Sequence, residues 1–144
     1  MQAAIGLAQL EKLGHFIARR KENYRYMYDN LQELSDILVL PEPTEKSDPS
    51  WFGFPITLKE STDTNRKTLI EYLDQNKIGT RLLFAGNVTR QPYFESEHYR
   101  VDGALDSTDT VMNNTFWIGV YPGLNQEMLD YIVEQLELYF GVGF

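Results

Sequence analysis

The chain opens with MQAAIGLAQLEKLGHFIARRKENYRYMYDNLQEL (residues 1–34), and this stretch predicts one long helix. It contains no proline, and its apolar side chains recur at spacings of three, four or seven residues, as in an amphipathic helix. A helix of about 33 residues reaches roughly 50 Å, whereas a compact chain of 144 residues has a diameter of about 38 Å. We therefore expect the helix to project beyond its own domain. Its apolar positions are Leu10, Leu13, Ile17, Tyr24, Met27, Leu31 and Leu34.

The start of this helix, residues 1–8, is small and apolar on nearly every face and lacks a capping Ser, Thr, Asp or Asn. Apolar helix surface is normally covered by other protein. We expect residues 1–144 to form a single domain that begins inside a helix of a larger protein, with residues 1–34 as an interdomain helix. The alternative is a frayed helix start with nothing missing.

Composition limits the classes of function. Hydrophobic residues make up 42% and charged residues 24% of the chain, which is typical of a globular domain. The net charge of -8 disfavours nucleic-acid binding. Because there is no cysteine, the chain cannot supply disulfides, iron–sulfur ligands or a thiol nucleophile, and its two histidines disfavour a metal site. It lacks an apolar run of about 20 residues and a signal-peptide pattern, so we expect a cytoplasmic protein without membrane contact.

The rest of the sequence alternates between strand and helix patterns. Short apolar or alternating runs predict strands, and apolar stripes with the helical period predict helices. Their order predicts an α/β (α+β) two-layer sandwich, in which helices cover one face of a small, mostly antiparallel sheet of three or four strands. The predicted strands are residues 37–40, 51–58, 80–84 and 116–121, and the predicted helices are residues 65–76, 107–114 and 126–140.

Individual residues refine these elements. Pro55 has no N–H to donate, so its strand needs an edge position or a bulge. Gly79 suits the exit from the helix over residues 65–76, and Trp117 is expected in the core. The expected helix caps are the segment Thr62–Thr64, Ser107 or Thr108, and Asn125.

The segment 77–100 carries four cations and two anions, so its charge is +2 on a chain whose net charge is -8. It overlaps a long aperiodic loop, residues 85–104, and such loops in compact domains are commonly functional. Arginine suits phosphate and carboxylate groups because its planar fork donates two hydrogen bonds at once. We interpret the loop as a site for a small anion. The alternative is that its arginines pair with surface carboxylates.

The same loop offers groups that could recognise a sugar or a base. The amides of Asn87 and Gln91 can hydrogen-bond hydroxyl groups, and the rings of Tyr93 and Phe94 present flat faces. The alternative is an ordinary turn whose aromatic side chains pack into the core.

No complete reaction centre is visible in the sequence. There is no glycine-rich phosphate loop before a helix and no G-x-S-x-G motif. His15 lies within the first helix and is expected at the surface, and His98 has no identifiable partner. We predict a binding or lid domain that contains neither a catalytic residue nor a metal ligand.

Four segments resemble, in collinear order, the DegT-type sugar aminotransferases. These enzymes depend on pyridoxal phosphate (PLP) and have the aspartate aminotransferase fold. The resemblance implies that the chain is the small C-terminal domain of a fold type I PLP enzyme. The segments are residues 1–13 (MQAAIGLAQLEKL), 79–81 (GTR), 90–93 (RQPY) and 117–124 (WIGVYPGL).

Within this family, residues 81–87 (RLLFAGN) and 116–124 (FWIGVYPGL) resemble the dehydrase branch that acts on CDP-4-keto-6-deoxyglucose in lipopolysaccharide dideoxysugar synthesis. The resemblance implies a homodimeric parent enzyme that uses PLP or pyridoxamine phosphate, carries a 2Fe-2S cluster and has a reductase partner. It places the base, the cofactor pocket and the cluster ligands in a missing N-terminal domain upstream of Met1. The chain alone is therefore expected to be inactive.

The resemblance also implies which residues face the nucleotide-sugar substrate. Four polar side chains are expected to bind sugar hydroxyls or the diphosphate, and two tyrosines are expected to pack against the substrate. Two alternatives remain: the same domain of a sugar-nucleotide aminotransferase, or a non-enzymatic nucleotide-sugar binding or dimerisation module. The six residues are Arg81, Asn87, Arg90, Gln91, Tyr93 and Tyr121.

Overall fold

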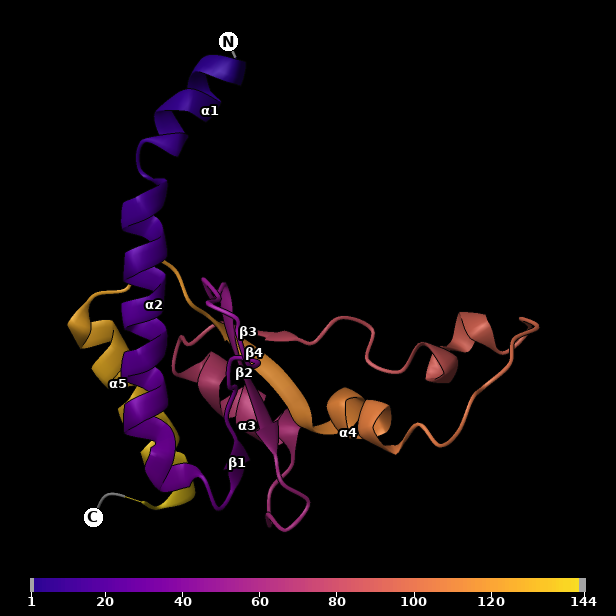
Figure 1. Ribbon diagram of the computed structural model, residues 1–144. Helices are drawn as coiled ribbons and strands as arrows, with labels where there is room; N and C mark the ends of the chain where they lie inside the picture. Colours follow the sequence, from indigo (N-terminus) through magenta and orange to yellow (C-terminus); the bar gives the residue numbers. More distant parts are fainter. Residues whose placement is uncertain (1, 143–144) are drawn as a thin grey trace.

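The computed structural model describes residues 2–142, which form five α-helices and four strands in the alternating order that the sequence predicts (Figure 1). The helices are α1 (Gln2–Leu10), α2 (Leu13–Asn30), α3 (Arg66–Gln75), α4 (Asp106–Asn114) and α5 (Gln126–Phe140). The strands are β1 (Leu38–Val39), β2 (Gly53–Leu58), β3 (Thr80–Leu82) and β4 (Thr115–Gly119). Three short 3-10 helices lie at Leu31–Leu34, Val88–Arg90 and Pro92–Phe94.

The four strands form one antiparallel sheet in the order β1-β2-β4-β3. Ile118 of β4 lies opposite Phe54 of β2 on one side and Thr80 of β3 on the other. Since every second residue of a strand shares a face, the buried apolar residues of β2 and β4 collect on one side of the sheet. This arrangement confirms the predicted α/β sandwich.

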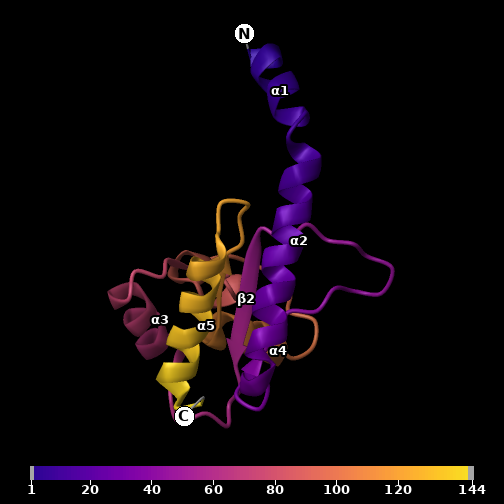
Figure 2. The same cartoon turned by 90° about the vertical axis from the view of Figure 1, so that its left-hand side faces the viewer.

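Helices α2, α3 and α5 cover that side of the sheet (Figures 1 and 2). Their apolar stripes and the sheet residues form one core, in which Phe54 and Phe116 are fully buried. Helix α4 lies on the other side of the sheet and has no buried residue, because its sequence is mostly polar. The helical core residues are Met27, Leu31, Leu34, Leu69, Leu73, Leu129, Ile132, Val133 and Leu136.

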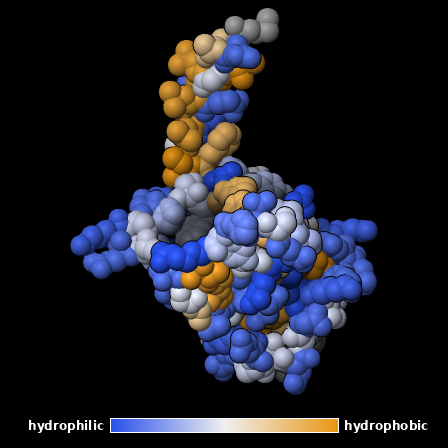
Figure 3. Space-filling view, turned by 90° about the vertical axis from the view of Figure 1, so that its right-hand side faces the viewer, coloured by the Kyte–Doolittle hydropathy of each residue, from blue (hydrophilic) through white to orange (hydrophobic). Residues whose placement is uncertain are grey.

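The predicted single helix over residues 1–34 is wrong in one respect, because it is interrupted after Leu10. A 3-10-type hydrogen bond of 3.0 Å from the Lys12 N–H to the Gln9 carbonyl replaces the α-helical pattern there. No packed side chain stabilises this part, since every residue from 2 to 15 is exposed. The predicted projection is confirmed: α1 extends clear of the domain, and its surface is largely apolar (Figures 1 and 3).

Helix caps were predicted correctly only in part. Asn125 caps α5 by accepting a hydrogen bond of 2.9 Å from the Met128 N–H, as expected. The prediction of Thr62–Thr64 is wrong, because Asn65 caps α3 instead, at 3.0 Å from the Thr68 N–H.

Two further local predictions need correction. Helix α4 follows Leu105 without a side-chain cap, so Ser107 and Thr108 do not cap it. The left-handed residue after α3 is Lys77, with φ 63°, rather than Gly79. Lys77 reverses the chain there and places the next N–H, that of Ile78, 2.9 Å from the Leu73 carbonyl.

Pro55 lies in β2, an interior strand of the sheet, yet its nitrogen lies at a local edge, in agreement with the predicted edge position. Val120 and Phe52 form a hydrogen-bonded residue pair between β4 and β2. Hydrogen-bonded and non-hydrogen-bonded pairs alternate along an antiparallel ladder, so Pro55 and Trp117 form a non-hydrogen-bonded pair. The nitrogen of Pro55 therefore faces the β1 side, where β1 pairs only with Thr57 and Leu58. The proline sits beyond the end of its neighbour, at a local edge.

Trp117 was predicted in the core, and this is wrong. Its neighbours Phe116 and Ile118 are buried under the helices, so strand alternation puts Trp117 on the opposite face, where it is half-buried. Among residues 2–142, no helix is long and apolar enough to span a membrane.

Candidate functional site

Residues 83–105, which we call the arm, extend away from the sheet between β3 and α4 (Figure 1). Asp109 of α4 holds the base of the arm. Its Oδ1 atom accepts a hydrogen bond of 2.6 Å from the Asn87 side chain, and its Oδ2 atom accepts one of 2.9 Å from Arg90. Hydrogen bonds from Arg90 and then Asn87 keep the pKa of the Asp109 carboxyl below its usual value.

The amide of Asn87 organises the start of the arm. It is 1% exposed, and its Oδ1 atom accepts hydrogen bonds from the N–H (3.1 Å) and the hydroxyl (2.7 Å) of Thr89. The Gln91 side chain donates to the Ala85 carbonyl at 2.8 Å. The structure thus brings together Asn87, Arg90 and Gln91, and engages all three in bonds that hold the loop.

Arg81 lies elsewhere, on the sheet. It is exposed on β3, directly opposite Trp117 of β4, and one of its N–H groups donates to the Thr80 carbonyl at 2.8 Å. Among the described residues it has no carboxylate within ion-pair distance, although the chain is acidic. Its guanidinium group therefore keeps free donors for an anion.

The two predicted tyrosines occupy different places. Tyr93 lies on the arm, is 64% exposed, and contacts Phe94 edge-on with ring centroids 5.7 Å apart. Tyr121 follows β4 and lines an apolar groove of about 370 Å³ beside α5, together with Leu124 and Met128. None of the other five predicted residues lines that groove. The six residues are thus distributed over the sheet, the arm and the groove.

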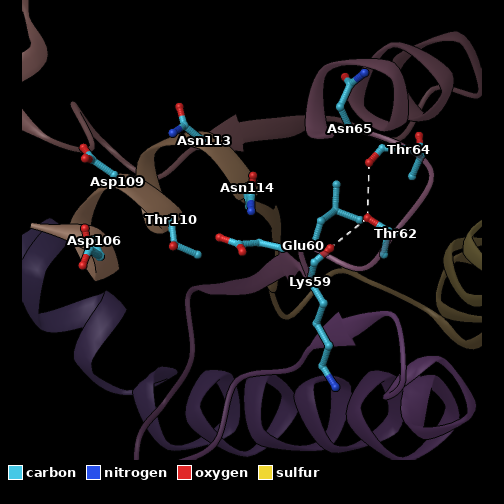
Figure 4. Close-up of a pocket in the computed structure, with 11 residues that line it drawn as sticks. Lys59, Glu60, Thr62, Thr64, Asn65, Asp106, Asp109, Thr110, Asn113 and Asn114 are labelled. Atoms are coloured by element: carbon cyan, nitrogen blue, oxygen red, sulfur yellow. Dashed lines mark hydrogen bonds between the residues drawn. The ribbon is translucent and has the colours of Figure 1, made fainter.

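A larger cleft of about 530 Å³ opens between α4 and the start of α3 (Figure 4). Its charged groups are mainly carboxylates, those of Glu60, Asp106 and Asp109. Lys59 points away from the cleft in Figure 4, and its ammonium group donates to the Ser35 carbonyl at 2.6 Å. The cleft is therefore unsuited to a phosphate, because its carboxylates repel an anion.

The described residues also do not form a PLP site. A cofactor phosphate needs cations or a cluster of free N–H groups, whereas the cleft offers carboxylates, amides and hydroxyls. No group of three or more His, Cys, Asp or Glu among residues 2–142 is arranged to hold a metal ion. His15 is exposed on α2, as predicted.

Three residues of this region were missed from the sequence. Asp109 lies 19 residues after Arg90, and the sequence contains no signal that pairs them. The rings of Phe52 and Trp117 lie 4.8 Å apart on the uncovered face of the sheet. For Trp117 the sequence did contain a signal, the alternation of side chains along its strand. Trp117 stands between two apolar residues in a strand, and alternation puts it on the face opposite theirs.

A sequence model of the DegT/DnrJ/EryC1/StrS aminotransferase family matches residues 1–137. The chain belongs to this family. Among similar proteins, the lipopolysaccharide biosynthesis protein RfbH of Salmonella typhimurium is 60% identical over 144 residues, which is all of this chain and 33% of that protein. The dTDP-4-dehydro-2,6-dideoxy-D-glucose 3-dehydratase of Saccharopolyspora spinosa is 46% identical over 136 residues, 94% of this chain and 29% of that protein.

Solved structures of this family share the fold. The E. coli GDP-4-keto-6-deoxy-D-mannose-3-dehydratase with bound hydrated PLP matches with a TM-score of 0.82 and 29% identity, over 92% of this chain and 34% of that chain. The predicted resemblance to DegT-type enzymes and the predicted fold are therefore confirmed. The chain spans about a third of the length of the relatives that it matches.

Proposed function

We propose that the chain is the C-terminal, substrate-covering domain of a 3-dehydrase that acts on CDP-4-keto-6-deoxyglucose in lipopolysaccharide dideoxysugar synthesis. The main support is the 60% identity, over all 144 residues, to a lipopolysaccharide biosynthesis protein. The 46% identity to a nucleotide-sugar 3-dehydratase supports the reaction class. The CDP group and the sugar are carried over from the resemblance of residues 81–87 and 116–124.

In this proposal the rest of the enzyme supplies the cofactor site. Its PLP or pyridoxamine phosphate supplies the electron sink for loss of the 3-hydroxyl group. The described residues of this chain do not fit that group, so no chemical step is assigned to them. The 2Fe-2S cluster also belongs outside the chain, since the sequence contains no cysteine. A homodimer, a reductase partner and a cytoplasmic location are parts of the same proposal.

The chain's own role is to position the substrate. Arg81 is exposed and has free donors, which suits the substrate diphosphate. Asn87, Arg90 and Gln91 hold the arm in a fixed shape, and the exposed ring of Tyr93 lies on that arm. We therefore assign Arg81 to direct binding of the substrate. Asn87, Arg90 and Gln91 are assigned to positioning of the arm. Tyr93 and Tyr121 remain proposed packing residues.

A chimeric enzyme tests the proposal. This chain would replace the matching third of the Salmonella typhimurium relative, and the chimera would be incubated with CDP-4-keto-6-deoxyglucose and pyridoxamine phosphate. We expect loss of the 3-hydroxyl group together with a methylene proton of the cofactor, detected by mass spectrometry as a covalent sugar–pyridoxamine phosphate imine that has lost a further molecule of water. The matched control is the unaltered relative.

Two outcomes would overturn the proposed reaction. Transfer of the amino group from pyridoxamine phosphate to C4, which leaves PLP and keeps the 3-hydroxyl group on the sugar, would instead support the aminotransferase alternative. A folded chimera, with the circular dichroism of the parent, that turns over neither reaction would favour the binding or dimerisation module.

A further inference from the structure

The uncovered face of the sheet carries an aromatic surface that the helical core does not use. Helix α4 lies at one end of this face, where Thr115 and Thr57 hydrogen-bond each other at 2.7 Å. Beyond that end lie Phe52, Trp117 and Arg81, which come from or adjoin three neighbouring strands. We call these three residues the platform.

The indole ring of Trp117 lies across the main chain of the sheet. Its Nε1–H donates to the Leu82 carbonyl of β3 at 3.2 Å. At its other end, a Cβ atom added to Gly53 of β2 would meet ring atoms at 2.6 Å. The ring therefore spans from β3 to β2 with one side against the backbone. Trp117 is half-buried, so part of the ring stays accessible to a planar ligand, and a side chain at position 53 would push the ring out of this orientation.

Phe52 forms a second wall. Its ring centroid lies 4.8 Å from that of Trp117, the two planes meet at 52°, and the side chain is 62% exposed. Such large exposed aromatic surface next to a strand end is typical of a binding surface rather than a core. Two tilted rings give a planar ligand both a face to stack on and an edge contact.

Arg81 adds a positive charge at the edge of this aromatic surface. It lies directly opposite Trp117 across the β3–β4 ladder, so the two side chains leave the same face of the sheet as neighbours. Its bond to the Thr80 carbonyl uses one of five N–H donors. A planar aromatic surface with an adjacent unpaired cation is suited to an aromatic ring that carries a phosphate.

We propose that the platform binds the nucleoside diphosphate end of the nucleotide sugar, with the base stacked on Trp117, Phe52 at its edge and Arg81 on the diphosphate. This inference rests on the proposed function, since it takes the ligand class from it. Stacking tolerates different bases because every base has a π face. That tolerance agrees with relatives whose names specify dTDP and GDP sugars.

Fluorescence of the intact chain tests the platform directly. The chain has two tryptophans, and Trp51 stacks on Tyr24 at 4.8 Å, so a Trp51→Phe variant leaves Trp117 as the sole reporter. We expect CDP to quench its emission saturably, and GDP and dTDP to bind within a few fold of CDP. Calorimetry with CDP, cytidine and pyrophosphate gives the dissociation constants of variants that lack the reporter.

Each platform residue has its own expected signature. Trp117→Leu should raise the Kd for both CDP and cytidine roughly tenfold or more. Arg81→Gln should raise the Kd for CDP and pyrophosphate and leave that for cytidine unchanged. Phe52→Ala, at an exposed position that costs the fold little, should weaken CDP and cytidine binding. The matched control is Arg25→Gln, which removes an exposed arginine from α2 on the helical side.

Two results would overturn the platform. One is a folded chain, by circular dichroism, that binds none of the three nucleotides. The other is CDP binding that Trp117→Leu, Phe52→Ala and Arg81→Gln all leave unchanged. Either result with an active chimera would refute the platform alone, whereas an inactive folded chimera would count against the proposed function.

Discussion

Gly86 of the arm lies close against Met112 of α4. Its φ of 65° is a left-handed conformation that side chains disfavour, and an added Cβ atom would lie 2.6 Å from two atoms of the Met112 side chain. Gly103, farther along the arm, also has a positive φ, 75°, but an added Cβ would meet no atom within 4 Å. A substitution at Gly103 would therefore cause backbone strain alone, whereas one at Gly86 would cause backbone strain and a steric clash.

We predict that Gly86→Ala destabilises the fold more than Gly103→Ala. Both substitutions incur the left-handed penalty of about 1 kcal/mol. Only Gly86→Ala also displaces Met112, which adds roughly 1–3 kcal/mol as in other overpacked sites. Urea unfolding of the two variants measures the difference. Equal midpoints and slopes would show that the arm can shift away from α4 at no cost.

Asp109 makes the anchoring of the arm depend on pH. Because Arg90 and Asn87 lower its folded-state pKa below the unfolded value of about 3.9, the folded state favours the charged form. The resulting stabilisation is present in full above about pH 4 and is lost as the pH falls through the folded pKa. Arg90 keeps its charge throughout this range, since the same pair raises its pKa.

The expected experiment compares the intact chain with Asp109→Asn in urea between pH 2 and pH 7. The variant should be less stable at neutral pH, and the difference should shrink below about pH 4. Asp106→Asn is the control, because it removes an exposed carboxylate from the same helix that, among the described residues, makes no hydrogen bond to the arm. A difference that persists undiminished at pH 2 would contradict the role of the carboxylate charge. Asn87 and Arg90 were named from the sequence, but Asp109 was not, because only the fold brings it to them.

At the scale of elements, α1 shows the difference between helical pattern and helical packing. The periodicity of residues 1–34 predicts the helix correctly, yet it gives no reason for the break after Leu10. Packing decides it: Leu31 and Leu34 are fully buried, whereas Leu7 and Leu10 are more than 60% exposed. Without tertiary contacts a helix depends on the intrinsic helix propensity of its residues, and Gly6 and Gly14 lower that propensity.

We therefore predict that Leu10→Gln leaves the free energy of unfolding of the chain within about 0.5 kcal/mol of the original. Leu31→Ala, at a fully buried position, should lower it by roughly 2–5 kcal/mol. Chemical unfolding followed by circular dichroism checks both. A large loss of stability in Leu10→Gln would mean that α1 packs against the domain.

The caps explain why some element boundaries could be predicted and others could not. Before α5 the sequence offers one capping residue, Asn125, two positions after Gly123 of the Pro122–Gly123 turn, and the structure uses it. Before α3 the segment 62–65 contains four residues in a row that can cap a helix. Propensity cannot choose among them, and the choice falls to Asn65 because Thr62 instead donates to the Lys59 carbonyl at 2.9 Å.

At the scale of the whole molecule, collinear motifs predicted the family and the sandwich, but no sequence pattern located the platform that we propose as a substrate-binding surface. The platform joins residues that are up to 65 positions apart, and the arm is fixed by a helix that follows it. Such a surface exists only after the strands have paired. The sequence shows residue types and alternation, while register and strand order decide which side chains meet.

The same architecture predicts where the folded chain is first cut by trypsin. Three exposed basic residues lie outside the packed layers and away from the Asp109 anchor: Lys12 after α1, Lys46 in the loop before β2, and Arg100 on the arm. Local opening costs least where few contacts are broken, so these sites should be cleaved first.

Arg66 provides the internal control, because its guanidinium group donates to the carbonyls of Met112 and Thr115 and ties α3 to α4. Mass spectrometry of a time course should show cuts after Lys12, Lys46 or Arg100 well before any cut after Arg66. An early cut after Arg66 would contradict this order of stability. It would mean that α3 opens more easily than the arm. The hydrogen bonds of Arg66 would then hold α3 less firmly than the hydrogen bonds of Asp109 hold the arm.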